Sequence, residues 1–266
     1  MNTDTKEKIV VVLSGGQDSV TCAFWAKEQG YELHAVTFNY GQRHARELEA
    51  ARIAADFVGV ESHDIVNLGP AVLKSTSPLV SNNELEQYPD HGSLPGGLEK
   101  TFVPMRNQLF LTLAANRAYA LGTNKMVTGV CQEDSGGYPD CRRDFIDAFE
   151  SASSFGSFTG KDGAPARLQV LTPLMYLTKA QSVLLALRLS GCYSALAFSH
   201  TAYDGAYPPT GKDHATLLRA KGFEVAGVPD PLVLRAWQDG LMRLPRTPNY
   251  NKEVISKYVG MMELGQ

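Results

Sequence analysis

The residues with the clearest chemical potential form one short loop, which reads Leu13, Ser14, Gly15, Gly16, Gln17, Asp18 and Ser19. Two glycines let a backbone curl without clashes at Cβ, so its N–H groups can converge on an anion. The two serine hydroxyls add further donors, and Asp18 either caps a following helix or helps to hold Mg²⁺. The loop therefore predicts a site for the phosphate groups of a nucleotide. The alternative is an ordinary strand-to-helix turn with a Ser/Asp cap.

Elements on both sides must hold this loop in place, and the sequence predicts them. Residues 9–13 form an apolar, mostly β-branched run that is typical of a buried parallel strand, and residues 20–28 continue as a helix. Residues 33–38 and 47–57 repeat the strand and the helix. Later segments extend the alternation, with helices over 108–121, 142–154 and 178–190 and strands over 125–129 and 170–172. This order favours an α/β fold, a parallel sheet with helices on both faces.

The chain divides into a larger and a smaller part. We expect residues 1–198 to form the nucleotide-binding α/β domain, because the alternation of strands and helices ends there. Within it, residues 75–101 are rich in Ser, Pro, Gly and Asn and form a loop or arm whose length points to a function. Residues 199–266 begin as polar turns up to residue 216 and continue from Leu217 as helix fragments separated by prolines, which predicts a small, mostly helical C-terminal region.

Composition and charge restrict the partners. Lysines and arginines number 25 against 28 acidic residues, a formal net charge of -3, so the chain lacks the positive surface that stable nucleic-acid binding requires. The sequence contains neither a signal-peptide pattern nor an apolar stretch long enough to span a membrane, so we expect a cytoplasmic location. The four cysteines include no CxxC pair and predict neither disulfides nor a zinc knuckle. A small molecule is the expected ligand.

The phosphate loop resembles that of the PP-loop ATP pyrophosphatases, which adenylate a carbonyl-type oxygen and release pyrophosphate. It lacks the lysine of a Walker A motif and the spacing of a dinucleotide fold, which argues against γ-phosphate transfer and NAD binding. Further motifs resemble those of the 7-cyano-7-deazaguanine synthases, the QueC family: FNYGQRH at 38–44, FVPMRN at 102–107, DSGGYPDCR at 134–142, LTPL and LTK within 171–179, and GVPDP at 227–231. This resemblance covers nearly the whole chain. It implies a Rossmann-like sheet of the adenine nucleotide α-hydrolase type and a homodimer.

The resemblance also implies a reaction and its cofactors. Such enzymes convert 7-carboxy-7-deazaguanine and ammonia, with ATP and Mg²⁺, into the nitrile that precedes queuosine in tRNA. The carboxylate attacks the α-phosphate of ATP to give an acyl adenylate, and ammonia displaces AMP to give an amide. A second adenylation, of the amide oxygen, permits elimination to the nitrile. Loop N–H donors and Mg²⁺ stabilise the charge on the departing pyrophosphate.

Roles for single residues follow from the same resemblance. The expected catalytic group is Asp18, Ser19, Arg106 and Lys179, in which the two cations lie near phosphate or the substrate carboxylate. Nucleotide contacts are expected from residues 13–19, Phe38 and Arg43. Substrate contacts are expected from Asn107, Asp134, Tyr138, Asp140 and Arg142, where the aspartates accept from guanine-like N–H groups and the tyrosine stacks on the base. Judged residue by residue, surface charges and an Asp/Gly turn are the alternatives.

One departure from the family concerns a structural zinc site. Family members carry one Cys followed by a CxxCxxC cluster late in the chain, but the matching positions here are Ala202, Thr210, Asp213 and Thr216. We therefore expect no zinc, and we expect this segment to be held by hydrogen bonds among Thr210, Asp213, His214 and Thr216. A different metal site is the less favoured alternative, with ligands from His200, Asp204, Asp213 and His214.

The loss of the zinc ligands leaves three functions open. The chain makes the nitrile, as the resemblance implies, or it stops at the amide or transfers the activated base to another nucleophile. Outside catalysis, the alternative is a degenerate nucleotide-binding module. Five retained residues weigh against that alternative: Ser14, Asp18, Ser19, Arg106 and Lys179.

Overall fold

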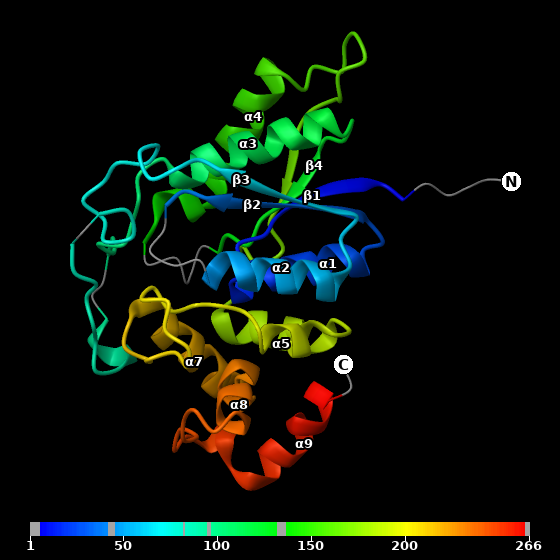
Figure 1. Cartoon of the computed structure of the whole chain (residues 1–266). Helices are drawn as coiled ribbons and strands as arrows, with labels where there is room; N and C mark the ends of the chain where they lie inside the picture. Colours follow the sequence, from blue (N-terminus) through cyan, green and yellow to red (C-terminus); the bar gives the residue numbers. More distant parts are fainter. Residues whose placement is uncertain (1–5, 42–45, 82, 95–96, 132–136, 264–266) are drawn as a thin grey trace, which may run out of the picture.

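A parallel five-stranded sheet forms the centre of the protein (Figure 1). The structure is a computed structural model that describes residues 6–41, 46–81, 83–94, 97–131 and 137–263. The strands are β1 (Lys8–Val12), β2 (Glu32–Asn39), β3 (Ser62–Asn67), β4 (Lys125–Val127) and β5 (Gln169–Leu171). Their order across the sheet is β3-β2-β1-β4-β5, and every neighbouring pair is parallel. The predicted α/β fold class is confirmed.

Helices cover both faces of this sheet (Figure 1). One face carries α1 (Gln17–Glu28) and α2 (Arg46–Val58), and the other carries α3 (Arg106–Ala120) and α4 (Arg143–Gly156). Helices α5 (Lys179–Arg188) and α6 (Cys192–Leu196) form a further layer that packs against α1 and α2. Strand β1 explains this arrangement, because its successive side chains point to opposite faces. Ile9 and Val11 pack in the core beside α1 and α2, whereas Val10 packs in the core beside α3 and α4. Both faces of the central strand are therefore buried.

The strand order places a ligand crevice beside β1. The chain builds β2 and β3 on one side of β1 and then β4 and β5 on the other, so the direction of strand addition reverses there. Val10 lies between His34 of β2 and Met126 of β4. Ligands of open α/β sheets bind at the carboxyl ends of the strands at such a reversal. The phosphate loop directly follows β1 and so opens into this crevice.

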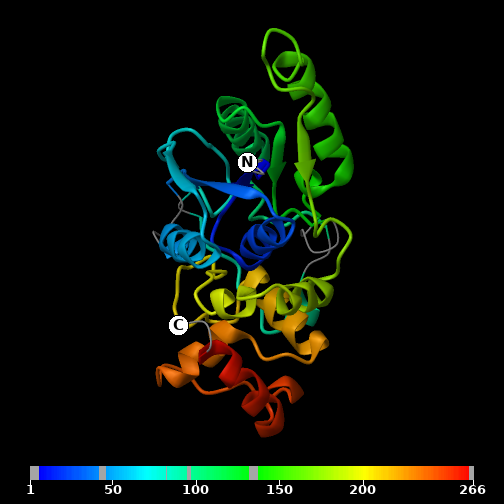
Figure 2. The ribbon, with the colours of Figure 1, turned by 90° about the vertical axis from the view of Figure 1, so that its right-hand side faces the viewer.

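The C-terminal helices pack below α5 and α6 (Figures 1 and 2). They are α7 (His214–Ala226), α8 (Pro231–Gln238) and α9 (Lys252–Glu263), and short 3-10 turns lie at η1 (His91–Ser93), η2 (Pro139–Cys141) and η3 (Pro248–Tyr250). Helix α7 packs along α5, and α6 contacts both α8 and α9. In both views α9 lies at the end of the molecule opposite α4. No helix in the described part is long and apolar enough to cross a lipid bilayer.

Two predictions about the elements were wrong. Strand β3 was not predicted, because its sequence, SHDIVN, is half polar; as an edge strand it pairs with β2 alone and leaves much of its surface in solvent. Helix α7 begins at His214, three residues before the predicted start at Leu217, because the Asp213 side chain accepts from the backbone N–H of Thr216 and caps the helix. The cysteines are free, as predicted.

Candidate active site

The phosphate loop is held in a conformation that requires glycine at one position. Gly15 has a φ of 82°, which is left-handed. A Cβ on Gly15 would lie 2.6 Å from the backbone N of Ala51 and 2.7 Å from the backbone O of Glu47, both in α2. These atoms belong to helix backbone and cannot move aside, so only glycine fits. Gly15 thus packs against α2, while its neighbours face the crevice.

Hydrogen bonds within the loop fix the two serine hydroxyls. The Ser14 and Ser19 Oγ atoms lie 3.0 Å apart, and the Ser14 backbone N–H donates to Ser19 Oγ at 3.1 Å. The Ser19 hydroxyl lies 3.0 Å from the carbonyl of Gly16 and donates to it. Gly16 is the cap residue of α1, and no side chain caps this helix. The first N–H groups of α1 therefore face the crevice without a side-chain acceptor, which favours an anion there.

Lys179 reaches the phosphate loop and binds Asp18. The Lys179 Nζ lies 2.8 and 3.0 Å from the two carboxylate oxygens of Asp18. Of the two roles left open for Asp18, the structure does not show the helix cap, because Asp18 lies in the first turn of α1 and accepts from the lysine. Lys179 is the first residue of α5, whose cap residue, Thr178, forms a full capping box with Gln181. The fold thus brings a cation across 161 residues of sequence to the loop.

A cavity of about 350 Å³ opens at the carboxyl ends of β1, β2 and β4. Its volume lies within the usual range of small-molecule sites, about 300–1,000 Å³. Most of the predicted site residues line it: Leu13, Ser14, Gly16, Gln17, Asp18, Ser19, Phe38, Arg106, Asn107, Tyr138 and Lys179. The structure therefore brings residues of the predicted nucleotide and substrate groups into one cavity.

The remaining predicted site residues do not line the cavity or cannot be placed. Asp140 is buried beside the cavity, and its backbone carbonyl accepts from the Asn107 side chain at 3.4 Å. Arg142 is exposed at the start of α4, so the structure does not support its predicted substrate contact. Arg43 and Asp134 lie outside the described residues.

The Arg106 guanidinium lies in the cavity wall among tyrosines. It hydrogen-bonds Tyr40, and burial raises the pKa of that tyrosine to about 12. Burial alone would lower the pKa of Arg106, but the neighbouring Tyr40, Tyr138, Tyr203 and Asp140 outweigh this effect and the pKa is raised. No carboxylate lies within salt-bridge distance of Arg106 in the part of the chain that the structure describes. A positive charge that has no ion-pair partner among the described residues therefore faces the cavity.

Aromatic side chains form the wall at the end of β2. The rings of Phe38 and Phe110 stack with centroids 4.4 Å apart and an interplanar angle of 12°, and Tyr40 tilts against Phe110. All three residues line the cavity. Phe110 was missed as a site residue because it reads as one more apolar position of a helix. This wall can pack against the flat face of a heterocyclic base.

Tyr138 joins the cavity to the segment 97–101. Its hydroxyl lies 2.5 Å from Thr101 Oγ1, and its ring packs against Phe102 at 5.3 Å with an angle of 47°. Tyr138 is 7% exposed, so most of the ring is already covered by protein. Its predicted stacking on a base stays a prediction.

Helix α7 packs closely against the side chain of Lys179 at Gly222, a residue that was not predicted from the sequence. A Cβ on Gly222 would lie 2.4 Å from Lys179 Cγ and 3.0 Å from its Cβ. These atoms are the near end of the side chain, so the lysine cannot give way without a shift of α5. The close packing at Gly222 therefore fixes the position from which the Lys179 side chain extends toward the phosphate loop.

We expect Gly222→Ala to lower kcat about 10- to 100-fold, because misplacement of a reacting group by about 1 Å has effects of this size. Steady-state formation of AMP measures it. Gly260→Ala is the matched control, since Gly260 lies in α9 with nothing near its Cβ position, and its rate should equal that of the unmodified protein. A Gly222→Ala variant with unchanged kcat would show that the close packing does not position Lys179.

The positions that match the zinc ligands of the family do not form a zinc site. They offer a methyl group at Ala202, hydroxyls at Thr210 and Thr216, and one carboxylate at Asp213. This set does not fit the thiolate and imidazole ligands that structural zinc requires. In the described residues no group of three or more His, Cys, Asp or Glu side chains could hold a metal ion. The four residues of the alternative site, His200, Asp204, Asp213 and His214, are thus not gathered into such a group.

The hydrogen bonds expected in this segment form only in part. Asp213 accepts from Thr216 as predicted, with a distance of 2.9 Å. Thr210 is instead 3.4 Å from Asp204 Oδ2, and the His214 Nε2 lies 3.5 Å from Glu99 Oε1. Burial lowers the pKa of His214 and raises the pKa of Glu99. The predicted network was therefore wrong for Thr210 and His214, which bind outside the set.

Asp213 provides a pH-dependent prediction. The residue is 5% exposed, and its Oδ2 has no hydrogen-bond partner among the described residues. Burial raises the pKa of this carboxyl, so the native state holds the proton more tightly than the unfolded chain does. Its contribution to stability is full below the ordinary Asp pKa of about 3.9 and is lost as the pH rises through the raised value.

We expect Asp213→Asn to raise the free energy of unfolding by about 1 kcal/mol at neutral pH, because asparagine still caps α7 and leaves no buried carboxylate oxygen unpaired. The gain should shrink toward a pH of about 4. Urea unfolding over this pH range measures both effects. Asp56→Asn, at an exposed position of α2, is the control and should change little. Equal stability of the Asp213→Asn variant and the unmodified protein at all pH values would contradict the prediction.

Comparison with known proteins identifies the family. The sequence model of the family described as queuosine biosynthesis protein QueC matches residues 8–227. The chain belongs to the QueC family. A 7-cyano-7-deazaguanine synthase of Gloeobacter violaceus is 50% identical over 228 residues, which cover 85% of this chain and 95% of that protein. The enzyme of the same name from Laribacter hongkongensis is 46% identical over 233 residues, 86% of this chain and 95% of that protein.

Among solved structures, the chain is similar to a 4-thiouridine synthetase in complex with RNA and bound ATP. The sequence identity is 20%, the TM-score is 0.45, and the match covers 88% of this chain and 53% of that one. Membership of the QueC family, predicted from the motifs, is thus confirmed by the family match and by relatives that span most of the chain.

Proposed function

We propose that this chain is an ATP-dependent ligase that converts 7-carboxy-7-deazaguanine and ammonia into 7-cyano-7-deazaguanine, the activity that its relatives are named for. One observation supports this most directly. The Arg106 guanidinium, which has no ion-pair partner among the described residues, faces the same cavity as the phosphate loop and Lys179. A carboxylate bound at a buried arginine gains charge-assisted hydrogen bonds and lies within reach of a nucleotide on the loop.

Each part of the cavity has a task in the proposed reaction. The loop and the uncapped N-terminus of α1 bind the β- and γ-phosphates, and Lys179 neutralises charge on the pyrophosphate as it leaves. Arg106 orients the substrate carboxylate toward the α-phosphate. Ammonia then attacks the acyl adenylate at carbon, AMP departs with the C–O bond electrons, and the amide forms; adenylation of the amide oxygen and loss of a second AMP give the nitrile.

The donor set of the cavity fits the expected Mg²⁺. Asp18 and Glu47 are the carboxylates in its described lining, and protein-bound Mg²⁺ commonly uses one or two carboxylates together with phosphate oxygens. When bound, the ion would neutralise charge on the pyrophosphate. Homodimer formation, a cytoplasmic location and a domain boundary at residue 198 remain parts of the proposal that rest on the sequence.

Turnover with the proposed substrates tests the function. The protein is incubated with Mg-ATP, 7-carboxy-7-deazaguanine and ammonium, and AMP, pyrophosphate and the mass of the base are followed together. We expect two AMP for each nitrile formed, without added zinc. An amide as the only product would show that the chain stops halfway, and absence of AMP would contradict the proposed substrate. Omission of ammonium is the control and should leave no nitrile.

A further inference from the structure

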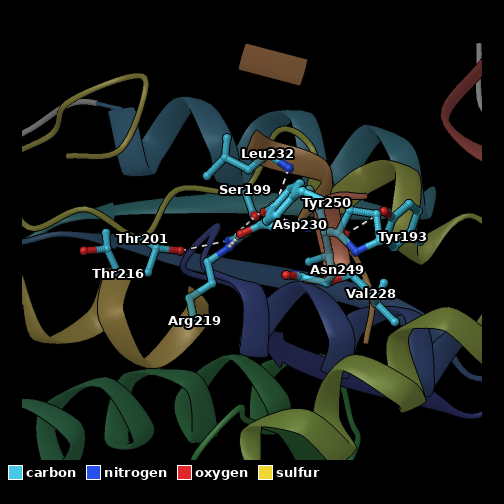
Figure 3. Close-up of polar contacts among 12 residues, drawn as sticks. Tyr193, Ser199, Thr201, Thr216, Arg219, Val228, Asp230, Leu232, Asn249 and Tyr250 are labelled. Atoms are coloured by element: carbon cyan, nitrogen blue, oxygen red, sulfur yellow. Dashed lines mark hydrogen bonds and ion pairs between the residues drawn. The ribbon is translucent and has the colours of Figure 1, made fainter. Parts of the chain in front are cut away.

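A buried ion pair connects the C-terminal helices to a segment beside the phosphate loop (Figure 3). Arg219 in α7 and Asp230, the cap residue of α8, are each 3% exposed. The guanidinium donates from Nε to one Asp230 oxygen at 2.6 Å and from Nη2 to the other at 2.8 Å. It also donates to the hydroxyls of Ser199 and Thr201, at 2.7 and 2.9 Å, and to the carbonyl of Leu196 at 3.2 Å. These bonds use all five N–H donors of the arginine.

The carboxylate of this pair is held from the other side as well. Asp230 Oδ1 accepts from the backbone N–H of Leu232 at 2.9 Å, and the Asp230 N–H donates to the Tyr250 hydroxyl at 3.1 Å. The Tyr193 hydroxyl donates to the neighbouring carbonyl of Pro229 at 2.7 Å. Asp230 is therefore fixed to α8 and to η3, and Arg219 cannot turn away without leaving charge unpaired.

Residues 199–201, which Arg219 binds, contact the phosphate loop directly. Between Ser199 and Thr201, the backbone N–H of His200 donates to the carbonyl of Gly15 at 2.9 Å. The His200 carbonyl lies 3.6 Å from the Cβ position of Gly16. A hydrogen bond to the Gly15 carbonyl sets the plane of the peptide that ends in the Gly16 N–H. This N–H donates to Ser14 Oγ at 3.4 Å within the phosphate loop, so the plane of the peptide affects the geometry of the loop.

We propose that Arg219 and Asp230 are a positioning pair, which holds residues 199–201 so that His200 fixes the Gly15–Gly16 peptide of the phosphate loop. Stability alone does not account for such a pair, because replacing a buried ion pair by apolar side chains is often neutral or stabilising. Its connection to the loop gives it a role in the geometry of phosphate binding. The assignment rests on the proposed function only for its kinetic readout.

A double variant, Arg219→Met with Asp230→Leu, tests the pair, because it removes both charges and keeps apolar volume. The measurements are urea unfolding, hydrogen exchange at the His200 amide, and kcat and KM for ATP-dependent AMP formation. We expect a folded protein in which exchange at His200 is about tenfold faster and kcat about tenfold lower, as expected from loss of one or two hydrogen bonds. A folded variant with unchanged exchange and unchanged kcat overturns the proposal.

A second variant covers the case in which the first fails to fold. Ser199→Ala with Thr201→Val keeps the ion pair and removes the hydrogen bonds from Arg219 to these two hydroxyls. The same changes in His200 exchange and in kcat are expected. Lys221→Met is the matched control, since this exposed lysine lies on the same helix as Arg219 and pairs with Glu224, and its loss should alter neither His200 exchange nor kcat. Hydrogen exchange needs no turnover, so an inactive wild-type protein would contradict the proposed function while the exchange data still decide this inference.

Discussion

Lys179→Met is expected to lower kcat for AMP formation about 10²- to 10³-fold, the usual effect of removing one charge-stabilising donor at a reacting centre. The ammonium group lies 2.8 Å from Asp18 at the phosphate loop, where negative charge grows on the departing pyrophosphate. Without it, the Asp18 carboxylate stands unneutralised beside the phosphates and repels them. Steady-state kinetics with ATP as the varied substrate should show the loss mainly in kcat.

The ion pair between Lys179 and Asp18 also predicts how substitutions of the two residues combine. Asp18→Asn alone removes the partner that orients Lys179, so it should reduce kcat as well, and the double variant should lose less than the product of the two single effects. Lys221→Met is the matched control: this lysine of α7 is exposed and pairs with Glu224 of the same helix, and its loss should leave kcat unchanged. A Lys179→Met variant that keeps kcat within about threefold would remove the lysine from the mechanism.

The elements around the candidate site that the sequence predicted correctly are those with local signals. An apolar strand, two glycines and a helix follow one another between residues 9 and 28, and their order alone places the phosphate loop at the end of β1. The capping box of α5 is likewise local, with four residues from Thr178 to Gln181. Such features depend on neighbours in sequence, so they can be identified before the fold is known.

Other features depend on contacts between distant residues and could not be predicted. The sequence left two roles open for Asp18, and the structure shows its partner, Lys179, because α5 packs beside α1. In the sequence, Arg219 cannot be distinguished from an ordinary arginine of a helix. Its ion pair with Asp230, the cap residue of α8, is seen only in the folded structure. Strand β3 was missed for a different reason, since an edge strand needs apolar residues on one face at most.

Arg106→Lys is expected to raise KM for the carboxylate substrate about 10- to 100-fold. Lysine keeps the positive charge but cannot donate two parallel hydrogen bonds to a carboxylate, so one charged hydrogen bond is lost. KM for ATP should change far less, since the phosphates are proposed to bind at the loop and Lys179, which line another part of the same cavity. Arg117→Lys is the matched control, because Arg117 lies on the same helix and pairs with Asp64 at the surface. Equal rises in both KM values would place Arg106 at the nucleotide instead.

A second prediction for Arg106 concerns the free energy of unfolding. Arg106 is a cation in a cavity wall; burial disfavours its charge, whereas Tyr40 and its other neighbours favour the charge. Arg106→Met should therefore leave the free energy of unfolding within about 1 kcal/mol of that of the unmodified protein while it abolishes turnover, since the loss of a desolvated charge and the loss of the hydrogen bond to Tyr40 act in opposite directions. Urea unfolding measures the first effect and AMP formation the second. A variant that loses stability and activity together would assign Arg106 to the fold and leave the substrate carboxylate without its expected partner.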